Sequence, residues 1–363
     1  MQIIKPTTLS LISKTYRLQT DRTSIGVLCF FKLGDEDQLL VENEQWARIM
    51  PLLNQGQILD MGYAKPVAEL LVAGSAFASN AQPVSRMEVS VAMAGIDKKI
   101  TVVGDRFWQN RLWQPLSEPQ PFLQMPLDYA HAYGGAGFAN NTLGKGVIAA
   151  VSYDAEAKHY PLANLFYPDE WDQAVKQSKR PACFTPLDIS GPQRAQHQGT
   201  YDQDWLENQH PGFPVDTGPE LFNAAAEDQR ISGFFQPGEP YCITGMHPDI
   251  AEIRGCLPQK RVRAFITQQD KGFIEVKTRI DTVWFFPELE LGVAIYRGHV
   301  EVQDSLGLDV SQVLLAYENS DDSPRPMAYY QHIMQLRTDP ETAAAHLLNE
   351  SQRMPEKSDA EKH

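Results

Sequence analysis

The segment between Pro181 and Arg230 constrains the fold of this chain more than any other part. It combines six prolines and four glycines with aromatic residues that a disordered segment would lack. A loop that only connects two elements is about 4–6 residues long. We therefore expect a folded excursion pinned to a core, and long ordered loops of this kind often carry function. The aromatic residues are Phe184, Tyr201, Trp205, Phe213 and Phe222.

Strand patterns flank this segment on both sides. Ser24–Phe31 and Ala68–Ser79 are β-branched or aromatic runs, and Arg86–Ala94 alternates apolar and polar residues. A turn over Gly95–Lys98 leads into Lys99–Val103, which predicts a β-hairpin. Further strands are predicted at Tyr241–Gly245, Arg261–Gln268, Gly272–Thr278, Thr282–Phe286 and Leu291–Tyr296.

Towards the end of the chain, the spacing of apolar residues changes from a strand-like to a helix-like period. Val310–Ala316, Met327–Leu336 and Glu341–Leu348 have helical patterns, and Asp339 followed by Pro340 is typical of a helix start. A shorter helical turn is predicted over Asp202–Asn208, inside the loop-rich segment.

These patterns predict a mainly β fold with sandwich-like sheets shared by the N- and C-terminal halves. We expect one domain over residues 1–350, followed by a flexible tail over 351–363. Its parts are N-terminal strands over 20–110, an ordered loop-rich insertion over 115–236, C-terminal strands over 240–300 and a helical segment over 309–350.

Composition limits the classes of partner. The formal net charge of −14 over 363 residues disfavours non-specific binding to nucleic acid or anionic membranes. No run approaches the roughly 18 apolar residues of a membrane span, and the first 20 residues lack the apolar core of a signal peptide. The four cysteines form no CxxC pair, so we expect reduced, buried thiols and a soluble cytoplasmic protein.

Catalytic patterns are weak throughout. His197 and His210 flank several carboxylates, but their spacing matches no zinc motif. Two of the residues Asp202, Asp216 and Asp228 could form the carboxylate pair of a glycoside hydrolase. Helix caps and Asx turns are, however, the more ordinary role of aspartates in such a segment.

Phosphate and acyl-transfer motifs are absent too. Gly134–Gly137 and Gly144–Gly146 are glycine-rich, but no Walker motif is present. GxSxG is missing, and no cysteine has a basic setting that would favour a thiolate. The residues therefore predict a protein that is not an enzyme and that uses neither a cofactor nor a metal.

An ordered set of short phrases resembles an adaptor and chaperone family found beside type VI secretion effectors, catalogued as domain of unknown function 2169. The resemblance runs over about residues 16–340, and Ala130-His131 departs from the family's usual pair before the Gly-Gly motif. The phrases include Gly104–Trp108, Tyr133-Gly134-Gly135, Arg194, Gly199-Thr200-Tyr201-Asp202, Trp205, Phe222-Asn223, Asp228-Gln229 and Tyr296-Arg297-Gly298.

The resemblance implies a cytosolic adaptor that holds a secreted effector, often one with a PAAR-like tip module, and helps to seat it on the trimeric spike protein. We expect the insertion to supply the contact surface, with exposed aromatic residues and Arg194 as anchors. Tyr201 and Trp205 can equally pin the insertion to the sheets, and Trp284–Phe286 should be core. The alternative function is a β-sandwich carbohydrate-binding or glycoside-hydrolase-like module.

Overall fold

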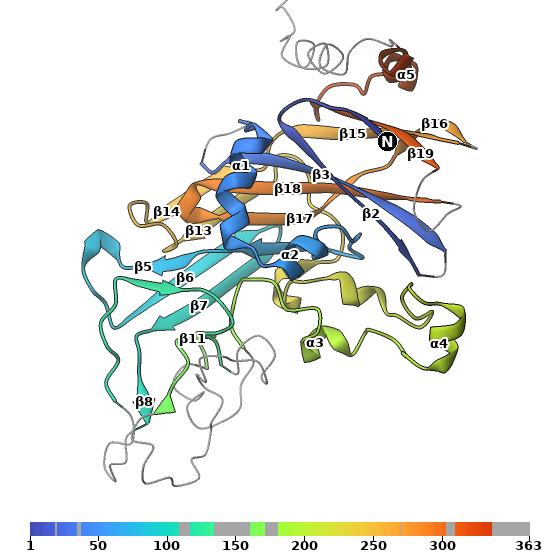
Figure 1. Cartoon of the computed structure of the whole chain (residues 1–363). Helices are drawn as coiled ribbons and strands as arrows, with labels where there is room; N and C mark the ends of the chain where they lie inside the picture. Colours follow the sequence, from blue (N-terminus) through green and yellow to red (C-terminus); the bar gives the residue numbers. More distant parts are fainter. Residues whose placement is uncertain are drawn as a thin grey trace, which may run out of the picture.

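The structure is a computed structural model, and it describes residues 1–18, 20–34, 38–108, 117–133, 160–170, 181–269, 271–302 and 309–335. The described chain is mainly β and is built around three large sheets, which confirms the predicted fold class (Figure 1). None of the described helices is long and apolar enough to cross a membrane.

The central sheet joins the two halves of the chain. Its six strands lie in the order β12-β4-β17-β18-β3-β2, and β3 pairs antiparallel with β18 along the whole length of that strand. The halves therefore share a sheet, as predicted. The strands are β2 (Leu9–Arg17), β3 (Asp21–Lys32), β4 (Ala68–Val72), β12 (Arg230–Ile231), β17 (Arg279–Phe286) and β18 (Leu291–Glu301).

A second sheet contains the predicted hairpin. β6 and β7 pair in register from Arg86↔Val103 to Met93↔Ile96. The turn between them is Ala94-Gly95, earlier than predicted, and both residues have positive φ (51° and 85°), as a tight hairpin requires. The order of the sheet is β11 (Leu165–Phe166), β7 (Ile96–Val103), β6 (Arg86–Met93), β13 (Pro240–Thr244) and β14 (Glu252–Cys256).

The third sheet corrects one prediction. Val310–Ala316 was expected to be helical, but it belongs to β19 (Val310–Asn319), which pairs with β15 and β1. Met327–Leu336 is helical as predicted, because α5 covers Met327–Gln335, whereas Glu341–Leu348 and the tail lie outside the described residues. The sheet has the order β1 (Gln2–Ile4), β19, β15 (Lys260–Gln268) and β16 (Gly272–Val276).

Burial on both faces explains why β19 has no alternating pattern. Val313 and Leu315 pack into the core between the sheets, whereas Leu314 faces the opposite side and packs with α5 residues such as Tyr330 and Ile333. A strand covered on both faces is a continuous apolar run, which periodicity alone does not separate from a buried helix.

The same construction gives the central sheet its core. In β17, Val283 and Phe285 pack between the sheets, whereas Trp284 and Phe286 lie on the opposite face. Trp284–Phe286 are at most 1% exposed, which confirms their predicted core role. Residues of α1 (Glu42–Ile49) and α2 (Gln55–Asp60) cover that face, and η1 (Met50–Leu52) connects the two helices.

Two short strands of the insertion pair into the large sheets. β11 pairs with β7 of the second sheet, and β12 pairs with β4 of the central sheet. Between them lie α3 (Pro192–Ala195), α4 (Gln203–Asn208), η3 (Pro219–Phe222) and η4 (Glu227–Gln229), so the predicted helical turn over Asp202–Asn208 is confirmed. In Figure 1, this part of the chain runs from α3 to α4, near one end of β2. Shorter elements are β5 (Ser75–Phe77), β8 (Phe107–Trp108), β9 (Gln124–Pro126), β10 (Tyr160–Pro161), η2 (Ser79–Ala81) and η5 (Pro287–Leu289).

Candidate functional site: the anchored insertion and its outer end

Arg194 fastens the insertion to the helical cover of the central sheet. Its guanidinium is 1% exposed and forms a bidentate pair with Asp60 of α2, at 2.6 and 2.9 Å. It also donates to the carbonyls of Leu187 and Leu221. All of these partners belong to the protein itself. The expectation that Arg194 is a surface anchor is therefore wrong, and its role here is internal.

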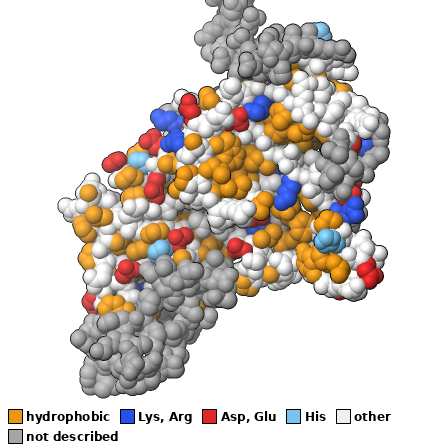
Figure 2. Space-filling model, in the orientation of Figure 1, with side chains coloured by type: hydrophobic (Ala, Val, Ile, Leu, Met, Phe, Trp, Pro, Cys, Tyr) orange, Lys and Arg blue, Asp and Glu red, His pale blue; other side chains and the backbone are white. Residues whose placement is uncertain are grey.

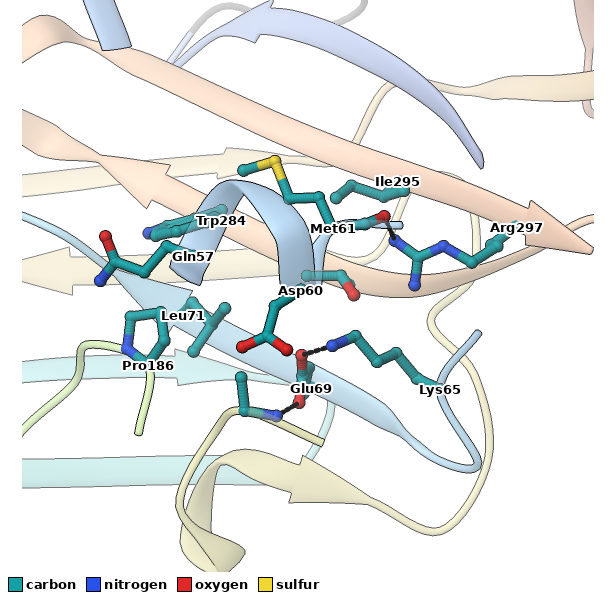
Figure 3. A pocket seen from close by; sticks show the side chains of 12 residues that line it. Gln57, Asp60, Met61, Lys65, Glu69, Leu71, Pro186, Trp284, Ile295 and Arg297 are labelled. Atoms are coloured by element: carbon teal, nitrogen blue, oxygen red, sulfur yellow. Dashed lines mark hydrogen bonds and ion pairs between the residues drawn. The ribbon is translucent and has the colours of Figure 1, made fainter. Parts of the chain in front are cut away.

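Glu69 forms a second attachment, inside the otherwise apolar strand β4. Its buried carboxylate accepts hydrogen bonds from the backbone N–H groups of Ala224 (2.7 Å) and Ala225 (3.1 Å) and from the Asn223 side chain (3.0 Å). Lys65 Nζ lies 3.2 Å away (Figure 3). Burial raises the pKa of Glu69, but the charge of Lys65 and these hydrogen bonds outweigh it, so the pKa lies below its ordinary value.

Gln229 and Asp228 form a third attachment, to the second sheet. Gln229 is fully buried and donates to the carbonyls of Leu70 and Phe184, at 2.6 and 2.9 Å. Lys98 of β7 donates to both side chains, reaching Gln229 Oε1 at 2.7 Å and Asp228 Oδ1 at 2.9 Å. Asp228 was predicted to be a cap or turn residue, but it lies in η4 and forms an ion pair with Lys98.

The charges at the base of the insertion cancel in pairs. Besides the three pairs above, Arg297 lies 2.8 Å from Asp281, and both side chains are buried. Burial raises the pKa of Asp281 more than the nearby cations lower it. The cavity left among these residues measures about 10 Å³, which is the space of one water molecule. Figure 3 shows the side chains that line it.

Aromatic packing completes the base. Phe222 is 2% exposed, and its ring centroid lies 4.9 Å from Tyr63, 5.3 Å from Phe213 and 5.7 Å from Tyr16 of β2. The Phe213 N–H also donates to the Arg17 carbonyl at 3.1 Å. Thus Phe222 joins the insertion to the N-terminal strands and is not itself available to a partner.

The outer end of the insertion is organised around α4. Asp202 caps this helix by accepting from the Trp205 backbone N–H at 2.9 Å, which confirms its predicted role. The Trp205 indole donates to the Gly212 carbonyl at 2.8 Å and meets the Tyr201 ring edge-on, at 4.7 Å between centroids. Trp205 therefore pins the loop that follows α4.

Gly199 and Asp216 lie where the outer end joins the base of the insertion, a place that we call the neck. Asp216 accepts from the Thr200 N–H (3.0 Å) and hydroxyl (2.8 Å), and these bonds lower its pKa. Gly199 has φ +79°, and a Cβ there would lie 2.7 Å from Asp216 Oδ1 and 2.9 Å from Pro214 Cβ. Both restrictions favour glycine at this position.

Apolar side chains are left open at the outer end. Tyr201 is 51% exposed, Leu206 54% and Val215 60%. Figure 2 shows hydrophobic side chains gathered over the α4 end of the molecule. We call Tyr201, Leu206 and Val215, together with the half-buried Trp205, the apolar tip. Sequence reasoning missed Leu206 and Val215, because nothing local to the sequence distinguishes an exposed aliphatic residue from a buried one.

The remaining predicted site residues lie elsewhere. Tyr133 is buried in a small cluster with Val103, Ala163 and Phe166, separate from the insertion's base. Gly134 and Gly135 lie outside the described residues. Sequence reasoning also missed Asp60, Lys65, Glu69 and Lys98; the available signal was a charged residue inside an apolar strand pattern, as at Glu69.

Residues suited to metal or thiol chemistry are also separated. Among the described residues, no group of three or more His, Cys, Asp or Glu side chains is placed to hold a metal ion. Cys29 and Cys183 are buried, and burial raises the pKa of Cys183 to about 11. Cys242 and Cys256 are only half-buried, which corrects the expectation that all four thiols are buried.

The family comparison covers most of the β-rich body. The family described as "Uncharacterized protein conserved in bacteria (DUF2169)" matches residues 18–297. The chain belongs to this bacterial family. Its match covers the second sheet, the entire insertion and the central sheet except for β2 and the end of β18. No curated protein and no solved structure matches the chain.

Proposed function

We propose that this DUF2169 protein is a non-enzymatic adaptor that binds a type VI secretion effector, often one with a PAAR-like module, and helps to load it onto the trimeric spike protein. The observation that carries the proposal is the apolar tip: exposed hydrophobic side chains held on a capped, internally bonded support. The order of sequence phrases shared with the secretion adaptors supports the choice of partner.

The tip has the properties of a protein-binding surface. Tyr and Trp present a large apolar area with a polar end and lose little conformational freedom on binding, which is why they dominate interface anchors. The support is rigid because the insertion's base is bonded to three elements: Arg194 pairs with Asp60 of α2, Glu69 of β4 accepts from Ala224, and Lys98 of β7 donates to Gln229. Loops held on a rigid scaffold commonly carry recognition.

Overall charge adds a second contribution. A net charge of −14 favours approach to a partner surface with a basic patch, so the association rate should fall as salt concentration rises. This steering acts on the rate of encounter, whereas the apolar tip supplies the contact.

A pull-down with the effector encoded beside this protein tests the proposal. The variant Leu206→Ser/Val215→Ser should lose co-purification of the effector while its circular dichroism spectrum stays unchanged. Leu52→Ser is the matched control, because Leu52 is similarly exposed (51%) but lies in η1, outside the insertion. If the double variant and Tyr201→Ser both bind as wild type does, the effector surface is not the tip.

The glycoside-hydrolase alternative predicts activity that depends on aspartates. Asp202 and Asp216 each accept hydrogen bonds from the backbone, and Asp228 pairs with Lys98, so these carboxylates have internal partners. We expect no hydrolysis of a panel of glycans and esters by the purified protein. Hydrolysis that is abolished in a folded Asp202→Asn variant would overturn the adaptor proposal.

A further inference from the structure

A second surface feature lies beside the base of the insertion. A groove of about 530 Å³ separates the insertion, at Pro219 and Phe222, from the far ends of β16 and β18. Tyr16 and Phe234 are half-buried and contribute apolar surface to its lining. This groove is far larger than the one-water cavity beneath the insertion, and it is open to solvent.

The acidic residues that line the groove are already neutralised. Glu275 forms a bidentate pair with Arg263, which includes a 2.8 Å bond to Arg263 Nη2. Asp281 is buried against Arg297. Two of the lining cations are therefore paired as well: Arg297 with Asp281, and Lys65 with Glu69. These pairs leave no net charge facing the groove.

Three further cations line the groove without such partners. Arg22 donates only to the Thr20 hydroxyl, and Lys277 and Arg279 are exposed; within the described part of the chain, none of the three has a salt bridge. The uncompensated charge of the groove is therefore positive, in a protein whose net charge is −14. An isolated basic site of this kind favours a ligand that carries carboxylates or other anions.

The pKa of His299 reflects both its burial and the positive charge of the groove. His299 lines the groove, and its pKa is lowered first by burial and then by the positive charge of Arg22, against a smaller opposing effect of Glu301. An imidazole in this position stays neutral near pH 7 and can still donate a hydrogen bond.

The groove continues past an arginine that an aromatic ring holds in place. The Arg279 guanidinium lies 4.9 Å from the centroid of the Phe234 ring. These two residues also line a second groove, of about 590 Å³, which reaches Pro237 and Tyr296. Together the two volumes exceed the roughly 300–1,000 Å³ of a small-molecule site, and they suit an extended chain better than a compact ligand.

We propose that these connected grooves bind an extended acidic peptide segment of a protein partner. The carboxylates would pair with Arg22, Lys277 and Arg279, and the apolar side chains of the segment would lie against Tyr16 and Phe234. This inference does not depend on the effector-loading function, because it concerns a different surface and a ligand defined by charge.

Fluorescence anisotropy of the full chain tests the proposal with a labelled decapeptide of alternating Glu and Leu. Wild type should bind this peptide at least about tenfold more tightly than the alternating Gln and Leu peptide, and raising the salt concentration should weaken the binding. Lys277→Glu/Arg279→Glu should weaken it at least about tenfold. Lys99→Glu is the matched control and should have no effect, because Lys99 is exposed on β7 and does not line either groove.

Other outcomes would overturn the proposal. If the Gln peptide binds as tightly as the Glu peptide, the groove recognises only the apolar side chains of its ligand. Tighter binding of a single-stranded oligonucleotide, lost in the same double variant, would make the ligand a nucleic acid. Full competition by millimolar phosphate would indicate a site for small anions. Phe234→Leu gives a milder test, since it removes the ring beneath Arg279 without changing charge and should weaken peptide binding about threefold.

Discussion

The base and the outer end of the insertion differ in chemistry although they belong to one segment. At the base, Arg194, Asn223 and Gln229 are at most 1% exposed, and their polar groups bind partners in the sheets and helices. At the outer end, Leu206 and Val215 are more than half exposed. The base is buried and polar, whereas the end is open and apolar.

This difference between the base and the outer end indicates how a long loop-rich segment becomes a rigid support. An insertion poor in regular structure has many backbone groups that must find partners when buried, and long polar side chains reach them. Once the base is fixed in this way, apolar side chains at the end can stay in solvent without collapsing onto the core. The most distinctive sequence residues therefore mark attachment, and the contact surface lies on less distinctive ones.

The largest expected effect comes from breaking the base. Arg194→Met should lower the free energy of unfolding by about 3–5 kcal/mol, because Asp60 is left as an uncompensated buried charge. Urea unfolding followed by circular dichroism measures the loss. Arg194→Met/Asp60→Leu should be more stable than the single variant. Equal or greater loss in the double variant would show that the charge pair is not what matters.

The contribution of Glu69 should depend on pH. Its pKa is lowered in the folded state, so its stabilisation is present above the unfolded value of about 4.3 and disappears as pH falls through the folded pKa. Glu69→Gln should cost about 1–3 kcal/mol at pH 7, and the difference from wild type should shrink below about pH 4. Unfolding free energies over this pH range measure it, with the exposed Glu44→Gln of α1 as control. A constant difference across pH would contradict the prediction.

The neck between base and end should respond to a single methyl group. Gly199→Ala should cost more than about 1 kcal/mol, because the new Cβ meets Asp216 and Pro214 in addition to the strain of positive φ. Gly272→Ala is a close control: its φ is +70°, but no atom lies within 4 Å of the added Cβ. Melting temperatures should fall further for the first variant. Equal shifts would mean that only the backbone conformation matters.

The smallest effect on stability should come from the tip. Leu206→Ser and Val215→Ser should each change the unfolding free energy by no more than about 0.5 kcal/mol, since both side chains are largely in solvent. Thermal unfolding compares them with wild type. A loss above about 1 kcal/mol would show that the tip supports the fold and would erase the contrast with the base.

Local patterns in the sequence predicted those features that depend on near neighbours. The β6–β7 hairpin follows from alternation and a turn, and the α4 cap follows from Asp202 placed three residues before the N–H that it accepts. The mainly β class followed from strand patterns repeated on both sides of the insertion.

Tertiary structure decided what depends on distant partners. β19 is a strand because it pairs with β15 and β1, and burial on both of its faces removes the alternation that would have identified it. Arg194 is buried because Asp60, 134 residues away in sequence, pairs with it. Leu206 and Val215 are exposed because the core closes beneath the insertion without them. A residue's own sequence neighbourhood fixes its backbone preference, but its burial and its partners exist only once segments far apart in the chain have packed together.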